Sequence, residues 1–247
     1  MATGCVSSKK TPATENQATT TEVTTEATTD TTAPSEATTG DVKSSEAATG
    51  SHKVKVELIT LVKSLEGESE YTMVIPKITV DGKEATEINE SLSKYIKDNY
   101  KLEVNEDHAD GMSTRIFWGV KDNTLSVIIC ASETFTDYFT NDVFNYDLDT
   151  LKTIEDSEVT KRLGMTDEAF FAKTTEILKK YCEKNPSSYD LDKTLASVKY
   201  DKITPFVMPD GTPGVLCPIC YSADSQFSGS DSMRCFNMTT MEHEIFG

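Results

Sequence analysis

Two cysteines three positions apart, in the segment Cys217-Pro218-Ile219-Cys220, form the sharpest chemical motif of the chain. With Cys235 and His243 they would supply three thiolates and an imidazole, the ligand set of a structural zinc site. The apolar residues around the motif favour a straight strand, however, and side chains three positions apart on a strand point to opposite faces. The two cysteines then cannot face one ion, so we predict no metal site and no bound cofactor.

Other thiol chemistry stays open at these positions. A thioredoxin-like redox role needs a helix directly after the Cys-x-x-Cys pair, and no helical pattern follows Cys220. A disulfide from Cys235 to Cys217 or Cys220 requires a hairpin centred near Phe227. Free cysteine is among the most buried residue types, so small buried apolar groups are the commonest outcome. The folded part contains five thiols, an odd number: Cys130, Cys182, Cys217, Cys220 and Cys235.

Acidic residues cluster between positions 103 and 110, with enough oxygen atoms for a divalent cation. The cluster lacks the regular alternation and the glycine of an EF-hand loop, so it reads as a solvated connection between a helix and a strand. Its members are Glu103, Glu106, Asp107, His108 and Asp110.

Catalytic signatures are absent from the sequence. There is no Gly-x-Ser-x-Gly elbow, no His-Glu-x-x-His helix and no glycine-rich phosphate loop. Paired carboxylates are always available in so acidic a chain and decide nothing. Trp118 would suit stacking on a sugar, but its apolar neighbours favour a place in the core. We therefore assign no catalytic residue, and whether the chain is an enzyme stays uncertain, with a non-enzymatic role favoured.

The charge excludes one class of partner. The 247 residues carry a net charge of −17. The first fifty residues contain three Lys and seven acidic residues and account for −4, which leaves −13 for the rest. A surface this acidic repels nucleic acid and attracts basic proteins, with salt-sensitive kinetics. We expect no nucleic-acid binding and predict a basic protein as a partner.

The first fifty residues predict a membrane anchor and a tether. Cys5 follows Ala2-Thr3-Gly4, like the end of a lipobox, although Ala2 stands where leucine is expected. Between Thr11 and Gly50, fourteen of forty residues are Thr, too polar a composition to repay the entropy of ordering. We therefore expect Cys5 to be lipidated, residues 1–50 to be a disordered linker, and the protein to lie outside the cytoplasm on a bacterial membrane. The alternative is a cytosolic protein in which Cys5 is incidental.

Residues 51–247 predict a single α+β domain, with two subdomains meeting near 150–165 as an alternative. Order is expected from near His52, with Pro76 closing the second strand. Oligomeric state is not readable from the sequence. Alternating and helical hydrophobic periods predict strands at 54–62, 71–75, 114–120, 124–131, 138–148, 203–208, 215–221 and 233–238, and helices at 88–100, before Gly164, at 166–181 and at 191–198.

Several short motifs resemble the extracytoplasmic domain shared by RsiV anti-sigma factors and PdaC-type peptidoglycan deacetylases. That domain usually opens with a Tyr-containing strand that ends in Pro, followed by a helix carrying Ile-Asn. A Gly-Gly-Ala-His-Gly signature is absent here, where residues 134–138 read Thr-Phe-Thr-Asp-Tyr. The resemblance implies an α+β fold, a surface location and ligand recognition without catalysis. The matching segments are 71–78, Ile88-Asn89, Leu125-Ser126-Val127, 145–152 (with Leu151 where Gly is usual) and 166–170.

The function predicted from these observations is a surface-tethered lipoprotein that binds a basic wall-active protein or an envelope component without catalysis. One alternative is a hydrolase, or a deacetylase accessory, that acts on peptidoglycan or polysaccharide. Another is a purely structural lipoprotein. No ligand-binding residue is assigned from the sequence.

Overall fold

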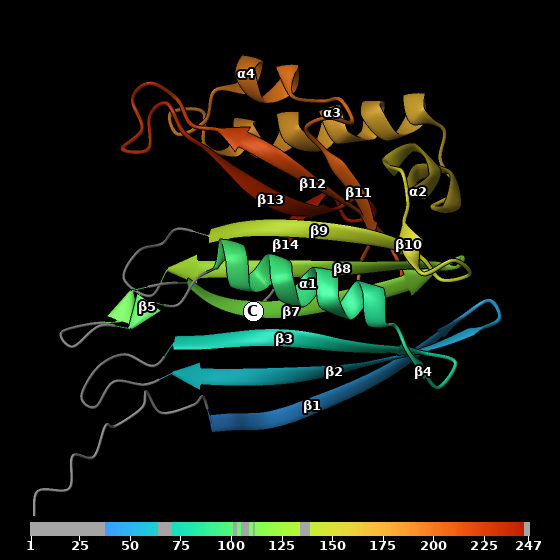
Figure 1. Cartoon of the computed structure of the whole chain (residues 1–247). Helices are drawn as coiled ribbons and strands as arrows, with labels where there is room; N and C mark the ends of the chain where they lie inside the picture. Colours follow the sequence, from blue (N-terminus) through green and yellow to red (C-terminus); the bar gives the residue numbers. More distant parts are fainter. Residues whose placement is uncertain are drawn as a thin grey trace, which may run out of the picture. The chain divides into compact units, whose positions relative to one another are not determined.

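The computed structural model describes residues 38–63, 71–100, 103–104, 109–110, 112–133 and 139–244. Within these ranges the chain forms three four-stranded antiparallel sheets, a short hairpin and four helices, which confirms the α+β prediction (Figure 1). Residues from Ala37 onward belong to one compact unit. The elements are β1 Thr38–Thr49, β2 His52–Lys63, β3 Tyr71–Val80, β4 Lys83–Glu84, α1 Thr86–Asn99, β5 Glu103–Val104, β6 Ala109–Asp110, β7 Met112–Lys121, β8 Thr124–Glu133, β9 Phe139–Asp147, β10 Lys152–Thr153, α2 Asp156–Arg162, α3 Asp167–Lys184, α4 Leu191–Ala196, β11 Thr204–Val207, β12 Pro213–Cys220, β13 Asp231–Asn237 and β14 Glu242–Glu244.

The first sheet has the order β1-β2-β3-β4 and corrects two predictions. Order does not start near His52, because β1 pairs with β2 from Thr38 to Thr49, inside the segment expected to be a linker. Threonine is β-branched and fits a strand, and Gly50 makes the turn with φ of 54°. Pro76 does not end its strand either: β3 continues to Val80. On the side of β3 away from β2, β4 pairs only with Thr79 and Val80, and no described strand pairs at Pro76. The N–H that proline lacks is therefore not needed for a ladder hydrogen bond there.

The second sheet has the order β10-β9-β8-β7, and its edge strand β7 lies beside β3 of the first sheet (Figure 1). Side-chain hydroxyls join the two edges in place of a backbone ladder. Thr114 Oγ1 accepts a hydrogen bond from Val74 N at 2.8 Å, and Ser113 Oγ accepts one from Thr72 N at 3.3 Å. One face of this sheet, with β2, β3 and α1, encloses the largest core, which includes Val56, Ile78, Ile88, Leu92, Leu125, Val127, Ile129 and Tyr146.

The third sheet, β11-β12-β13-β14, packs on the other face of the second. Ile128 meets Phe206 and Leu216 there, and polar side chains fasten the seam. Asn145 Nδ2 donates to Pro205 O at 2.8 Å, and Val207 N donates to Ser126 Oγ at 2.8 Å. Gly119 lets the layers meet, because a Cβ at this position would lie 2.1 Å from the backbone oxygen of Met208.

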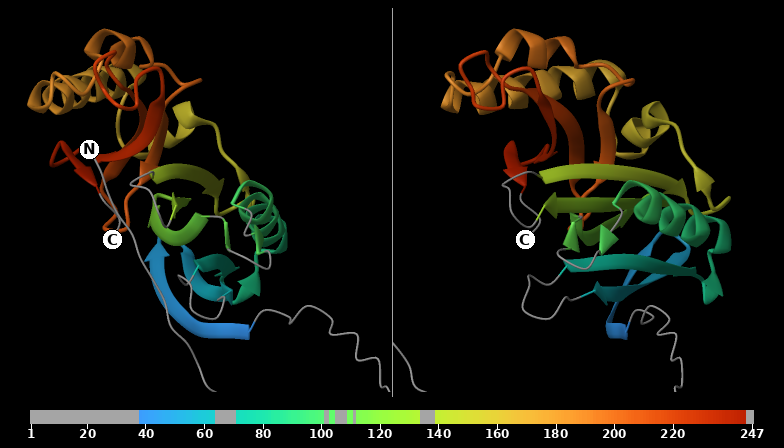
Figure 2. Two further views of the ribbon diagram at one scale, coloured as in Figure 1. Left: turned by 90° about the vertical axis from the view of Figure 1, so that its left-hand side faces the viewer. Right: turned by 60° about the vertical axis from the view of Figure 1, so that its left-hand side comes forward.

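Helices α3 and α4 cover the far face of the third sheet (Figure 2). Thr166 caps α3, since its Oγ1 accepts from Ala169 N at 3.2 Å. The helix buries Phe170, Ile177 and Leu178 against β12 and β13. The chain therefore changes near 150–165 from the first two sheets to the third sheet with its helices, and the two parts pack directly on each other.

Candidate functional site

Helix α1 provides one wall of a groove in the described part of the chain. Ile88, Leu92 and Ile96 recur at four-residue spacing, and all three are fully buried. This stripe fixes the helix on the core and leaves a second stripe facing the solvent side of the first sheet. Glu87 in the first turn and Lys97 in the last complement the helix dipole.

Asn89 holds α1 against β3. Its Oδ1 accepts from Ile78 N at 2.7 Å, and its Nδ2 donates to Ile78 O at 3.0 Å. The side-chain amide thus replaces a neighbouring strand for one residue of β3. These two hydrogen bonds set the angle between the helix and the strand, and so set the shape of the groove between them.

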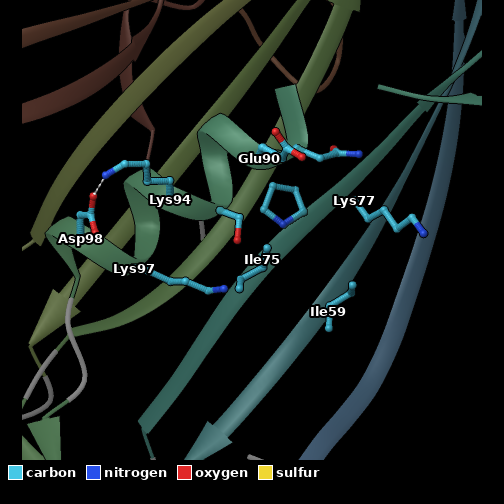
Figure 3. Close-up of a pocket in the computed structure, with 10 residues that line it drawn as sticks. Ile59, Ile75, Lys77, Glu90, Lys94, Lys97 and Asp98 are labelled. Carbon is cyan, nitrogen blue, oxygen red and sulfur yellow. Dashed lines mark hydrogen bonds and ion pairs between the residues drawn. The ribbon is translucent and has the colours of Figure 1, made fainter. Parts of the chain in front are cut away.

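The groove has a volume of about 510 Å³ and lies between α1 and the strands β2 and β3 (Figure 3). Its apolar lining comes from Ile59, Ile75 and Pro76 on the two strands. Ile59 and Ile75 are direct neighbours in the β2–β3 register. The volume falls in the usual range for small-molecule sites, but the groove is open along its length.

Charged side chains line the rim of this groove. Lys77 comes from β3, and Lys94 and Lys97 come from α1 (Figure 3). Lys94 pairs with Asp98, and Lys77 Nζ lies 3.4 Å from Glu84 Oε2. Among the described residues, no carboxylate lies within ion-pair distance of Lys97 Nζ. Glu90, Asp98 and the three lysines give the lining a charge of +1, in a chain whose net charge is −17.

This arrangement is suited to binding a ligand that has both apolar and anionic parts. An apolar floor takes up hydrocarbon surface, and an unpaired ammonium at the rim attracts an anionic group. The two carboxylates of the lining have no neighbouring metal-ligand cluster, because the described residues contain no group of three or more His, Cys, Asp or Glu placed to hold a metal.

The cysteines predicted to be chemically interesting are free thiols, mostly in the core. Cys217 packs in the core under α3, whereas Cys235 packs in the core against the second sheet. They point to opposite faces of the third sheet, so a disulfide between them is excluded. Burial raises the pKa of the Cys217 thiol well above its usual range. Cys182 is also buried, and Cys130 and Cys220 are partly exposed.

The other predicted site residues fall in different places. Trp118 is partly buried against the main core, and its Nε1 donates to Ser45 Oγ at 3.0 Å. His243 packs against the rings of Tyr181 and Phe236, with ring centres 5.6 Å away in each case, and burial lowers its pKa to about 4. Glu103 and Asp110 are register partners in the pairing of β5 with β6. Cys5, Glu106, Asp107, His108 and the segment 134–138 lie outside the described residues.

The groove residues were missed by the sequence reasoning. A signal for the helix wall exists, because Asn89, Ser93 and Lys97 recur at four-residue spacing beside the buried stripe. No sequence pattern indicates that Ile59 and Ile75 form the apolar floor of the groove, because their burial depends on where α1 packs on the sheet. Half-buried isoleucines on a strand are otherwise ordinary core candidates.

Comparisons of the chain with family models, with curated proteins and with solved structures give no match. No helix of the described ranges has the length and apolar character needed to cross a bilayer.

Proposed function

We propose that this chain is a non-enzymatic binding domain, held outside the cytoplasm on a bacterial membrane through a lipid on Cys5. The Thr-rich composition before β1 supports a spacer, and the lipobox-like residues before Cys5 support the anchor. The similarity to the RsiV and PdaC-type domain supports the same location. The α+β fold is compatible with that similarity, which stays a proposal.

The ligand that fits the groove best is an anionic amphiphile of the cell envelope, with a hydrocarbon part and a carboxylate or phosphate. Lys97, unpaired among the described residues beside an apolar floor, is the observation that carries this proposal. In a chain with 41 acidic and 24 basic residues, three lysines around one groove form a local exception to the repulsion of anions. Burial of the ligand's hydrocarbon part on Ile59 and Ile75 would supply the part of the affinity that does not depend on the ligand's charge.

Three eight-carbon probes test the ligand class by titration calorimetry: octanoate, octanol and octylammonium. We expect octanoate to bind at least about tenfold more tightly than octylammonium, because only the anion gains from the lysines. Lys97→Gln should weaken octanoate binding by about threefold to tenfold and leave octanol binding unchanged.

Lys179→Gln is the matched control, because Lys179 is an exposed lysine on α3 and lies outside the groove. It should leave all three affinities unchanged. Equal affinity of octanoate and octylammonium, or an octanoate affinity that Lys97→Gln does not lower, would overturn the proposed ligand class.

A basic wall-active protein, such as a lysozyme-type protein, is a second proposed partner. The charge of −13 after residue 50 supports it, since association between opposite charges is fast and weakens with salt. We expect the immobilised chain to capture a basic lysozyme-type protein at low salt and to release it at high salt. An acidic protein of similar size serves as the control. Absence of capture at low salt would remove this partner.

The hydrolase alternative has weaker support. Glu90 and Asp98 are the carboxylates of the groove, and Asp98 is neutralised by Lys94. A pair of carboxylates for glycoside cleavage needs one member with a raised pKa in an enclosed site. The open groove beside α1 does not provide that environment.

A further inference from the structure

A second surface of different chemistry lies on the third sheet, around Arg234 of β13. Its side chain points to the side of the sheet that α3 covers, and its guanidinium carbon lies 5.9 Å from the ring centre of Tyr181. Nη2 donates to Tyr221 Oη at 3.1 Å, and Nε donates to Ser232 Oγ at 3.1 Å. Arginine has five N–H groups, so three of them have no partner within the described residues.

The surroundings of Arg234 contain no compensating acid among the described residues. The nearest electrostatic partners are the phenols of Tyr181, Tyr189 and Tyr221. Glu242 on the neighbouring strand is already held by Lys180 and Lys184, at 3.0 Å each. His243 is neutral at neutral pH, because burial and Arg234 lower its pKa to about 4. A partly buried guanidinium without a carboxylate is unusual, because desolvation of a charge is costly unless it is paired.

Aromatic rings lead from Arg234 to the surface. Ring centres are 5.2 Å apart for Tyr181 and Tyr189, 5.8 Å for Tyr189 and Tyr221, and 5.1 Å for Tyr221 and Phe227. We call these four residues the aromatic row. Tyr181 belongs to α3, Tyr189 to the segment after α3, and Tyr221 directly follows β12. Phe227 lies in the β12–β13 loop, which extends beyond the sheet (Figure 1).

Phe227 ends the aromatic row in solvent. It is 42% exposed and is the large apolar side chain that stands out to solvent within the described ranges. A single exposed apolar residue needs no explanation. Here, however, the loop fixes the backbone of the residue: Phe227 N donates to Ser225 Oγ at 3.2 Å, and Phe227 O accepts from Ser230 Oγ at 2.6 Å. The ring itself lies against Tyr221, with ring centres 5.1 Å apart, so an ordered backbone and one ring neighbour place it for a flat ligand.

We propose that the aromatic row and Arg234 form a binding site for a saccharide that carries a carboxylate. The faces of Tyr221 and Phe227 offer apolar area for the C–H face of a pyranose ring, and the phenol and serine hydroxyls around them match its hydroxyl groups. The free N–H groups of Arg234 match a carboxylate in the planar, bidentate geometry that guanidinium prefers. The ligand carries few charges, because the charge of −13 after residue 50 repels polyanions such as nucleic acids.

A matched pair of sugars tests this site. Cellobiouronic acid and cellobiose differ only in one carboxylate, and binding to the full chain can be followed by amide NMR titration. We expect the acid to bind at least about tenfold more tightly than the neutral sugar. Arg234→Gln should remove this preference. Phe227→Ala should weaken both sugars by about fivefold to tenfold, and it cannot disturb the core because the ring is exposed.

Lys202→Gln is the control for charge alone, because Lys202 is an exposed lysine outside the aromatic row. It should change neither affinity. Equal binding of the two sugars, or a preference for the acid that survives Arg234→Gln, would overturn the proposal. Tighter binding of adenosine monophosphate than of cellobiouronic acid would also overturn it, in favour of a nucleotide. None of these outcomes bears on the groove beside α1, since the octanoate test uses other residues.

Discussion

Asn89 directs both polar atoms of its side-chain amide to the backbone of one residue, Ile78. It belongs to the Ile88-Asn89 pair on which part of the family resemblance rests. Ser126, from another matching segment, likewise serves the fold, since its Oγ donates to Asn145 Oδ1 at 2.6 Å and accepts from Val207 N. Motif residues of this chain are therefore connectors between elements, and a weak motif match can report a fold without reporting an activity.

Leu151 shows the same point through backbone conformation. It has φ of 56°, in the left-handed region, at a position where the similar family usually has glycine. Glycine adopts this conformation without a steric penalty, whereas leucine pays about 1 kcal/mol or more. The Leu151 side chain recovers part of this cost because it packs against the main core.

Replacement of Asn89 measures what one connector contributes. Asn89→Ala removes the acceptor of the Ile78 N–H in a partly buried place and leaves Ile78 O with the bond from Ala85 N, so we expect the free energy of unfolding to fall by about 1–3 kcal/mol. Urea denaturation gives this value directly. Asn99→Ala is the control, because Asn99 is exposed and bonds only to Tyr95 O within α1. For Asn99→Ala the free energy of unfolding should fall by no more than about 0.5 kcal/mol. An equal fall for the two variants would contradict the role of Asn89 as a connector.

At the scale of elements, the sequence predicts strands and helices where a periodic pattern is long. The predicted segments at 54–62, 114–120, 124–131 and 166–181 correspond to β2, β7, β8 and α3. The strands that the sequence did not predict are those that form only because a neighbouring strand pairs with them. β1 carries no apolar period and forms because β2 offers a ladder partner, and β4, β10 and β14 are two or three residues long.

The two candidate binding surfaces were beyond prediction for a related reason. Ile59, Ile75 and Lys97 come together only after α1 lies across the first sheet, and that placement depends on the Asn89–Ile78 contact. Tyr181 and Tyr221 lie forty residues apart in sequence, and the loop that carries Phe227 shows only turn-forming residues. Periodicity describes one element at a time, whereas a site is a property of elements packed together.

At the scale of the whole molecule, His52 joins sequence-distant parts of the fold. It begins β2 in the first sheet. Its Nδ1 lies 2.7 Å from Asp81 Oδ2, and its Nε2 lies 2.9 Å from Asp149 Oδ1, in the turn between β9 and β10. Asn123 Nδ2 donates to the other oxygen of Asp149 at 3.1 Å. Both ring nitrogens face carboxylates, so the geometry is satisfied when both carry a proton.

This bridge predicts a dependence of stability on pH. The hydrogen bonds to Asp149 and Asp81 raise the pKa of His52 above its ordinary value of 6.5. A group whose pKa is raised on folding stabilises the fold fully below the unfolded pKa and loses that effect as pH rises through the folded pKa. Asp81 has the opposite sign: the Lys53 backbone N–H and His52 lower its pKa, so its contribution is lost only in strong acid.

His52→Gln should abolish the part of the pH dependence that the bridge supplies. We expect the melting temperature of the native chain to exceed that of the variant most between pH about 5 and 6, and the difference to shrink as pH rises above about 7. The two carboxylates are exposed, so solvent screening keeps the difference modest and added salt should reduce it. His243 cannot produce this profile. Folding lowers its pKa to about 4, so its contribution makes stability rise with pH, the opposite sign, and it is the same in both proteins. A difference between the two proteins that stays constant from pH 5 to 9 would show that His52 supports the fold by packing alone, and that no charged link spans the first and second sheets.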